Sequence, residues 1–213
     1  MSRYLSALGC IAFFMVLAAG CEEDTTTTPS PKFSQAIDTS FAVGDSVTLM
    51  VDSFAGRITV REGQAGTIEV RATKWASRVG DLALIAIGMT EQPGTLQIQA
   101  TQPAGVNNVS LDLEITVPSD TELQLATGVG TIDCRGRPRG SCRYATGVGS
   151  VVLRLPADVN LTVELATGVG RIHVDFLVNG VVSEHSVNGA IGNGNEGEVH
   201  ARTGVGNIDL IRL

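Results

Sequence analysis

Apolar and polar residues alternate through most of the chain from residue 33 onward, and the phase of this alternation shifts at glycines. Within residues 161–169 the apolar side chains fall on odd numbers, whereas within residues 172–176 they fall on even numbers. Alternation with a period of two is typical of a β-strand with one buried face. A one-residue shift at Gly170 indicates a bulge or corner, where glycine adopts a positive φ at low steric cost. The pattern predicts pairs of short strands joined at glycine corners.

The same shift recurs along the chain, usually within the motif T-G-V-G and at intervals of about twenty residues. Fainter copies occur in residues 47–60 and 186–191. Together the copies predict six structural turn glycines: Gly56, Gly130, Gly149, Gly170, Gly189 and Gly206. Repeats of this length with two strands each are typical of stacked rungs that share a core. We expect an all-β fold, a β-solenoid or β-roll-like stack with a less regular N-terminal part; a β-sandwich of successive hairpins is the alternative.

The parity of the motif also predicts which side chains face the core. The valine between the two glycines has the parity of the core, as in Val169, and so does the hydroxyl residue three places before each marker glycine. These hydroxyl residues are Thr127, Thr146, Thr167, Ser186 and Thr203. Stacked strands would place the hydroxyls about 4.8 Å apart, close enough for a hydrogen-bonded ladder between them. An outward-facing threonine array that binds ice or a crystalline surface is the alternative.

The N-terminal segment has the pattern of an envelope-targeting sequence. Residues 1–20 place Arg3 before a short apolar run, which predicts a secretory signal peptide and is too brief for a membrane span. The stretch L-A-A-G-C resembles a bacterial lipobox, which implies a lipidated Cys21; ordinary secretion is the alternative. Residues 21–32 are acidic and rich in threonine and proline, as in a disordered tether. We expect a single folded domain over residues 33–213.

The composition limits the partners of the chain. It carries 15 Lys and Arg against 22 Asp and Glu, a formal net charge of −7, and loss of the signal removes only Arg3 from the basic residues. An acidic chain is poorly suited to nucleic acid as a bulk partner. Two cysteines lie within the domain, Cys134 and Cys142. In an oxidising envelope we expect them to form a disulfide; a two-cysteine metal site is the alternative, but further ligands are lacking nearby in the sequence.

Four arginines crowd into and beside the segment between these cysteines, C-R-G-R-P-R-G-S-C. We expect them to form a candidate anion-binding loop for phosphate or carboxylate groups. The residues are Arg135, Arg137, Arg139 and Arg143. A solvated loop whose charges aid solubility is the alternative.

The sequence contains few motifs for nucleotide binding, catalysis or metal binding. The T-G-V-G copies lack the third glycine of a dinucleotide fingerprint, and no Gly-x-Ser-x-Gly nucleophile motif occurs. His173, His185 and His200 fall in different repeats. Residues 192–197, G-N-G-N-E-G, have a loose likeness to a calcium-binding β-roll repeat, although a flexible turn fits them better. We therefore expect no enzymatic activity, no cofactor and no metal.

The opening F-A-V-G-D-S-V-T-L-M-V-D-S-F-A-G-R-I-T-V, the stretch V-S-L-D-L-E-I-T-V-P-S-D-T-E-L-Q-L-A-T-G-V-G-T-I-D-C and the recurring T-G-x-G-x-I resemble a family of bacterial envelope proteins. These are the β-strand-repeat proteins known as putative adhesins, a domain of unknown function related to the GIN head domains of putative auto-transporter adhesins. The likeness covers about residues 36–213. It implies an all-β, solenoid-like domain on the cell envelope and supplies no functional residues.

We expect a non-enzymatic, lipid-anchored binding or scaffolding module of the bacterial cell envelope, held by the inner or outer membrane. Its domain would lie in the periplasm or on the cell surface and bind an envelope polymer or protein. A periplasmic envelope-stress accessory protein and a polysaccharide-acting β-helix enzyme are the alternatives. Residues 207–213 end on a predicted strand without a cap, so we also expect self-association through the ends of the stack.

Overall fold

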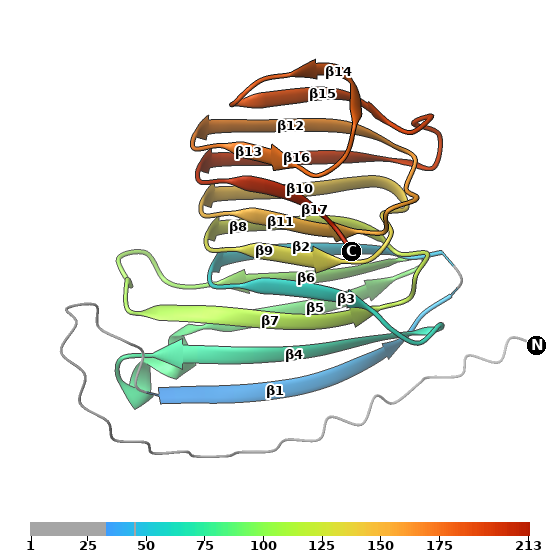
Figure 1. Ribbon diagram of the computed structural model, residues 1–213. Helices are drawn as coiled ribbons and strands as arrows, with labels where there is room; N and C mark the ends of the chain where they lie inside the picture. Colours follow the sequence, from blue (N-terminus) through green and yellow to red (C-terminus); the bar gives the residue numbers. More distant parts are fainter. Residues whose placement is uncertain (1–32, 45) are drawn as a thin grey trace, which may run out of the picture.

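The computed structural model describes residues 33–44 and 46–213, which form an all-β domain (Figure 1). The predicted signal peptide, Cys21 and the tether lie outside the described residues. Two mixed sheets pack on one shared hydrophobic core, an arrangement that fits the β-sandwich alternative. A 3-10 helix, η1 (Val79–Leu84), interrupts the strands. Within the described part of the chain, no helix is long and apolar enough to cross a membrane.

The first sheet has eight strands. In spatial order they are β1 (Phe33–Ala42), β4 (Thr67–Ala76), β7 (Val109–Val117), β3 (Ile58–Glu62), β9 (Ile132–Arg135), β11 (Val151–Leu155), β17 (Ile208–Arg212) and β13 (Ile172–Val174). The strands from β7 to β13 pair in parallel, whereas β1, β4 and β7 pair antiparallel. The sheet is therefore antiparallel at the end that holds the first strand and parallel elsewhere.

The second sheet has nine strands. In spatial order they are β14 (Val178–Val182), β15 (Ser186–Ile191), β12 (Leu161–Val169), β16 (Gly197–Val205), β10 (Gly140–Val148), β8 (Glu122–Val129), β2 (Thr48–Ala55), β6 (Thr95–Thr101) and β5 (Ala86–Gln92). The strands from β12 to β6 pair in parallel, and antiparallel hairpin partners cover both flanks.

Five of the six predicted glycine corners connect the two sheets. At each corner a strand of the second sheet ends, the chain turns, and the next strand runs in the first sheet: β2 to β3, β8 to β9, β10 to β11, β12 to β13 and β16 to β17. The glycines at these corners all have positive φ, between 119° at Gly56 and 148° at Gly130. The phase shift in the sequence therefore marks a passage from one sheet to the other.

The prediction for Gly189 is wrong. This residue lies in the middle of β15, opposite Val163 on one side and Gly180 on the other, and it is not among the positive-φ glycines. A Cβ at Gly189 would lie 2.5 Å from the carbonyl oxygen of Asn179 and 2.8 Å from the Cα of Gly180. Close approach of two strands, and not a corner, requires glycine here.

The repeats do not stack in sequence order. The last pair, β16 and β17, inserts between β10–β11 and β12–β13 in both sheets, as the ribbon in Figure 1 shows. The C-terminal strand is therefore inside the first sheet and not at its edge. At that end of the domain the edges are the short strand β13 and the hairpin strand β14.

The core consists of the inward-facing rows of both sheets. In the first sheet one row runs through Ile58, Ile132, Val151 and Ile208, which are fully buried neighbours in register. The facing strands of the second sheet contribute residues such as Leu125, Leu165 and Ala201. These side chains belong to a single cluster, so burial of apolar surface holds the two sheets together.

Candidate functional surface

Close backbone packing explains the glycines of the T-G-V-G motif. A Cβ at Gly147 would lie 2.6 Å from the carbonyl oxygen of Gly128 on the neighbouring strand, and one at Gly149 would collide with the carbonyl oxygen of Gly130. Gly149 also has a φ of 140°, a conformation that side-chain-bearing residues rarely adopt. Neighbouring corners therefore stack so tightly that only glycine fits.

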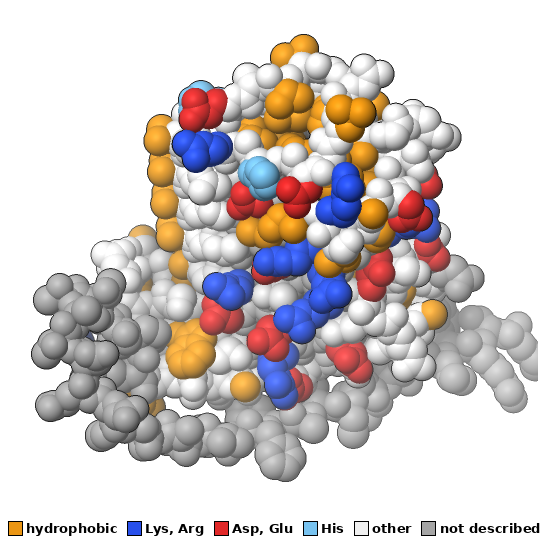
Figure 2. Space-filling view, viewed as in Figure 1, with side chains coloured by type: hydrophobic (Ala, Val, Ile, Leu, Met, Phe, Trp, Pro, Cys, Tyr) orange, Lys and Arg blue, Asp and Glu red, His pale blue; other side chains and the backbone are white. Residues whose placement is uncertain are grey.

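The valines between these glycines are exposed, contrary to the inward position that their parity predicts. Val129, Val148, Val205 and Val169 lie in register on neighbouring strands and are between 48% and 64% exposed. The chain has begun to turn at this point, so the side chain leaves the core and lies outside the corner. Figure 2 shows the resulting column of hydrophobic side chains along one side of the domain. We call these four residues the valine ridge.

The threonines of the motif face inward, as predicted, but their hydrogen bonds differ from the prediction. Instead of bonding to one another, three hydroxyls donate to a corner carbonyl oxygen of the neighbouring strand pair: Thr146 to Gly130 (3.1 Å), Thr203 to Gly149 (2.9 Å) and Thr167 to Gly206 (2.8 Å). Thr127 is equally buried. Ser186 is exposed, so its predicted inward position is wrong. The threonine array is thus part of the core, and the ice-binding alternative has no outward threonine row at these positions.

The predicted disulfide is absent: Cys134 and Cys142 are both free and buried. Cys134 lies on β9 in the first sheet and Cys142 on β10 in the second, where each occupies an inward position of the core. The Cys142 thiol donates to the carbonyl oxygen of Arg139 at 3.2 Å. Burial raises the pKa of both thiols, that of Cys134 well above its ordinary value. The two cysteines act as small apolar core residues.

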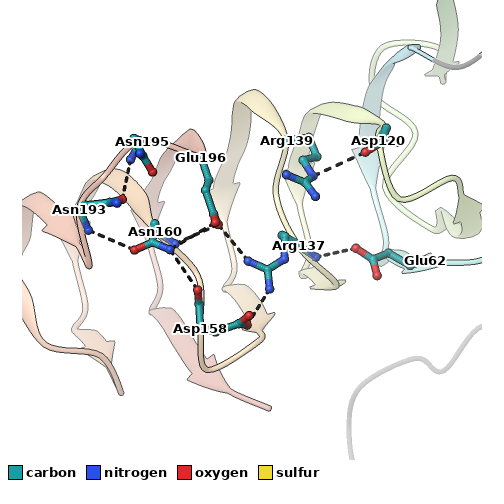
Figure 3. Close-up of polar contacts among 9 residues, drawn as sticks. All are labelled: Glu62, Asp120, Arg137, Arg139, Asp158, Asn160, Asn193, Asn195 and Glu196. Carbon is teal, nitrogen blue, oxygen red and sulfur yellow. Dashed lines mark hydrogen bonds and ion pairs between the residues drawn. The ribbon is translucent and has the colours of Figure 1, made fainter.

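Arg137 joins three loops at the strand ends opposite the glycine corners, and its guanidinium is already paired with carboxylates of the chain (Figure 3). Its guanidinium donates to Asp158 at 2.6 Å and to Glu196 at 2.9 Å, and its backbone N–H donates to Glu62 at 2.6 Å. Glu196 also accepts hydrogen bonds from the side chain and backbone of Asn160. These hydrogen bonds lower the pKa of Glu196, and those from Asn160 contribute most. The arginine acts as a clamp between the loops.

The other predicted loop arginines point to different parts of the surface. Arg139 forms an ion pair with Asp120 at 3.6 Å. Arg143 lies on β10, on the outer face of the second sheet, in register with Gln124 and His200. Arg135 lies on β9, in the first sheet. The four arginines therefore do not converge, and the candidate anion-binding loop is wrong as a single site.

Arg135 instead belongs to a row that crosses the outer face of the first sheet. It is in register with Arg61 on β3 and with Arg154 on β11. We call Arg61, Arg135 and Arg154 the arginine row. Each lies five residues after a corner glycine, namely Gly56, Gly130 and Gly149, so the sequence does carry a signal for this row. That signal becomes visible only when the repeats are aligned on their corners and outward positions are compared.

The charges of the arginine row are only partly neutralised. Arg154 forms an ion pair with Asp133. Neither Arg61 nor Arg135, both exposed, has a carboxylate within ion-pair distance among the described residues. In Figure 2, basic side chains lie over the middle of this face, with acidic side chains among them. Like charges directly opposite each other on neighbouring strands are destabilising, so the row costs folding energy in the unbound protein.

The remaining candidate residues are dispersed. His173 lies beside Asp175 on the first sheet at 2.9 Å, His200 lies near Glu164 on the second sheet at 3.2 Å, and His185 lies in the loop between β14 and β15. Over residues 33–44 and 46–213, no three His, Cys, Asp or Glu side chains group as metal ligands. The loop of residues 192–196 hydrogen-bonds to Asn160 (Figure 3).

Comparison with solved structures finds this fold in a protein from Clostridium sporogenes described as a "putative cell adhesion protein". The two chains are 17% identical with a TM-score of 0.54, over 84% of this chain and 100% of the other. A Bacteroides fragilis protein described as a "putative adhesin" is 12% identical with a TM-score of 0.34, over 83% of this chain and 97% of the other. No family model matches the sequence, and no curated protein matches it. The comparison therefore shows that this chain shares its all-β fold with the Clostridium sporogenes protein.

Proposed function

We propose that this chain is a non-enzymatic binding or scaffolding module of the bacterial cell envelope, tethered through a lipid on Cys21. The observation that carries the proposal is the outer surface of the parallel strands. There, equivalent side chains of neighbouring strands form rows, namely the valine ridge and the arginine row. The parallel strand pairs act as a rigid, solenoid-like ladder that presents these rows to a partner. The description of the Clostridium sporogenes protein as a cell adhesion protein supports this role.

The position of β1 sets where the tether joins the domain. Strand β1 is the edge of the first sheet at one end of the sandwich, whereas β13 and β14 form the edges at the opposite end. The residues between Cys21 and Phe33 span at most roughly 40 Å when fully extended. A lipid on Cys21 would therefore keep the β1 edge within about 40 Å of the membrane, and the β14 end lies at the opposite end of the sandwich from the tethered strand.

We further propose self-association through the β14 end. Among the strands that the structure describes, β14 pairs only with β15, and its sequence V-N-G-V-V contains no charge and no proline. Nearby apolar side chains are exposed: Leu177 by 89%, Val181 by 70% and Val182 by 60%. An uncharged, apolar edge strand is a template for pairing with another strand. The expected contact thus involves an internal hairpin and not the C-terminal strand.

Cell fractionation tests the tether and the location together. We expect the wild-type chain in the membrane fraction and the Cys21→Ser chain in the soluble envelope fraction or the medium. Cys10→Ser, which alters a cysteine within the predicted signal peptide, is the matched control and should stay with the membrane. Digestion by protease on intact cells would indicate a surface role, and protection until lysis a periplasmic one. Identical distributions for wild-type and Cys21→Ser would refute the lipid anchor.

A further inference from the structure

We propose that the arginine row, Arg61, Arg135 and Arg154, binds phosphate groups of a linear anionic polymer. The inference rests on the proposed function, since it names the ligand chemistry of the binding module. It replaces the loop predicted from the sequence with a site on the outer face of the first sheet. Only Arg135 is common to the two.

The register of the strands gives the site its shape. Neighbouring strands lie about 4.8 Å apart, so the backbones of the three arginines lie on a line about 10 Å long across the outer face of the sheet. Thr116 on β7 and Ile211 on β17 stand at the two ends of this line. A guanidinium presents a planar fork of donors that matches phosphate oxygens. A phosphate between two neighbouring arginines accepts hydrogen bonds from both, and further phosphates of an extended polymer follow the row.

The unbound row is electrostatically incomplete, which is the main argument for a ligand. Arg61 and Arg135 are directly opposite each other, and both point away from the core. Their mutual repulsion destabilises the sheet, while neither side chain makes an ion pair within the described residues. Arg71, on the same face, is by contrast paired with Asp38 at 2.8 Å. An anion between Arg61 and Arg135 would supply the negative charge that neutralises these two guanidinium groups.

The acidity of the rest of the chain favours a ligand that interacts locally and strongly. With a formal net charge of −7, the protein does not attract polyanions by its overall field. Binding must therefore come from short-range, charge-assisted hydrogen bonds to the row itself. A phosphate group offers several acceptor oxygens to two forks at once, which suits this geometry.

The test is titration of the mature chain carrying Cys21→Ser with inorganic polyphosphate of uniform length at fixed ionic strength. We expect the Arg61→Ser, Arg135→Ser double variant to bind at least about tenfold more weakly, since it loses charge-assisted hydrogen bonds. Arg71→Ser is the matched control from the same face and should leave the affinity unchanged. In a second measurement, at low salt and without ligand, Arg135→Ser should raise the melting temperature because it removes the repulsion.

Several outcomes would overturn the proposal. Absence of polyphosphate binding, or equal weakening by Arg71→Ser and the double variant, would exclude a defined site. Equally tight binding of polygalacturonate would show that carboxylates suffice. Binding only to vesicles that contain phosphatidylglycerol would identify lipid headgroups and refute a polymer ligand. None of these results bears on the fractionation experiment, so failure of the site and failure of the envelope tether remain distinguishable.

Discussion

The Thr146 hydroxyl donates a hydrogen bond to the carbonyl oxygen of Gly130 on the neighbouring strand pair, at 3.1 Å. This hydrogen bond joins β10 to the glycine corner between β8 and β9, and it gives the buried Thr146 hydroxyl a hydrogen-bond partner. Thr127 occupies the equivalent position one strand earlier, yet its hydroxyl has no hydrogen-bond partner among the described residues. The two threonines therefore form a natural pair for comparison.

We expect Thr146→Val to destabilise the domain by about 1 kcal/mol, because the Gly130 carbonyl loses a buried donor. Thr127→Val should be neutral or stabilising, since it removes a buried hydroxyl that makes no bond. Urea unfolding of the two variants beside wild-type measures the difference. Equal losses in both would show that the hydroxyls contribute through packing alone.

Substitution of a corner glycine should destabilise the domain strongly, whereas substitution in the valine ridge should leave its stability almost unchanged. Gly149→Ala places a side chain at a φ of 140° and against the Gly130 carbonyl, so we expect a loss of roughly 3 kcal/mol or more. Val148→Ser alters an exposed side chain and should change stability by no more than about 0.5 kcal/mol. Thermal unfolding distinguishes them. A large loss for Val148→Ser would mean that the ridge is packed against another part of the molecule.

The cysteines provide a test of the core. In the folded domain Cys134 and Cys142 should resist a thiol reagent, because they are buried and burial raises the pKa of both thiols. After denaturation without a reductant, both should react in full. Mass spectrometry of protein labelled before and after denaturation counts the thiols. A pair that stays unlabelled after denaturation would show that a disulfide forms in the cell.

The contacts of Glu196 with Arg137 and Asn160 predict that the stability of the domain falls at acidic pH. Hydrogen bonds from Asn160 and the Arg137 guanidinium lower the pKa of Glu196 in the folded state. Its contribution is therefore complete above the ordinary glutamate pKa and is lost as pH falls through the lowered folded-state value. We expect Glu196→Gln to lower the melting temperature at pH 7 and to lessen its dependence on pH between 5 and roughly 3. Glu91→Gln, at an exposed position on β5, is the control and should leave the profile unchanged.

Self-association should depend on the β14 edge. Val181→Lys places a charge on this exposed strand, which disfavours pairing with a second strand. Sedimentation velocity over a range of concentrations should show larger species for wild-type and a monomer for the variant. Val79→Lys, at an exposed valine remote from β14 in the sequence, is the matched control. A wild-type chain that stays monomeric at all concentrations would refute the contact.

The local sequence pattern predicts much of the fold but little of the candidate site. The parity shift at Gly130 or Gly149 reports a corner because alternation and positive φ are properties of a few adjacent residues. The shift assigned to Gly189 was misread, since a glycine needed for close approach of two strands gives the same signal as one needed for a turn. The predicted disulfide is absent, since Cys134 and Cys142 are both free and buried in the core. Short spacing in the sequence does not reveal whether two buried thiols meet in the geometry that a disulfide requires.

The sequence by itself determined that the chain is all-β, that short strands meet at glycine corners, and that the motif threonines face inward. Only the tertiary structure decided which strand pairs are neighbours, because near-identical repeats offer near-identical edges and the insertion of β16 and β17 depends on the packing of the whole domain. It also decided that Val148 lies outside the corner, where the chain turns away from the core. The arginine row follows from the same cause: long-range strand register, and not proximity in the sequence, brings Arg61, Arg135 and Arg154 together.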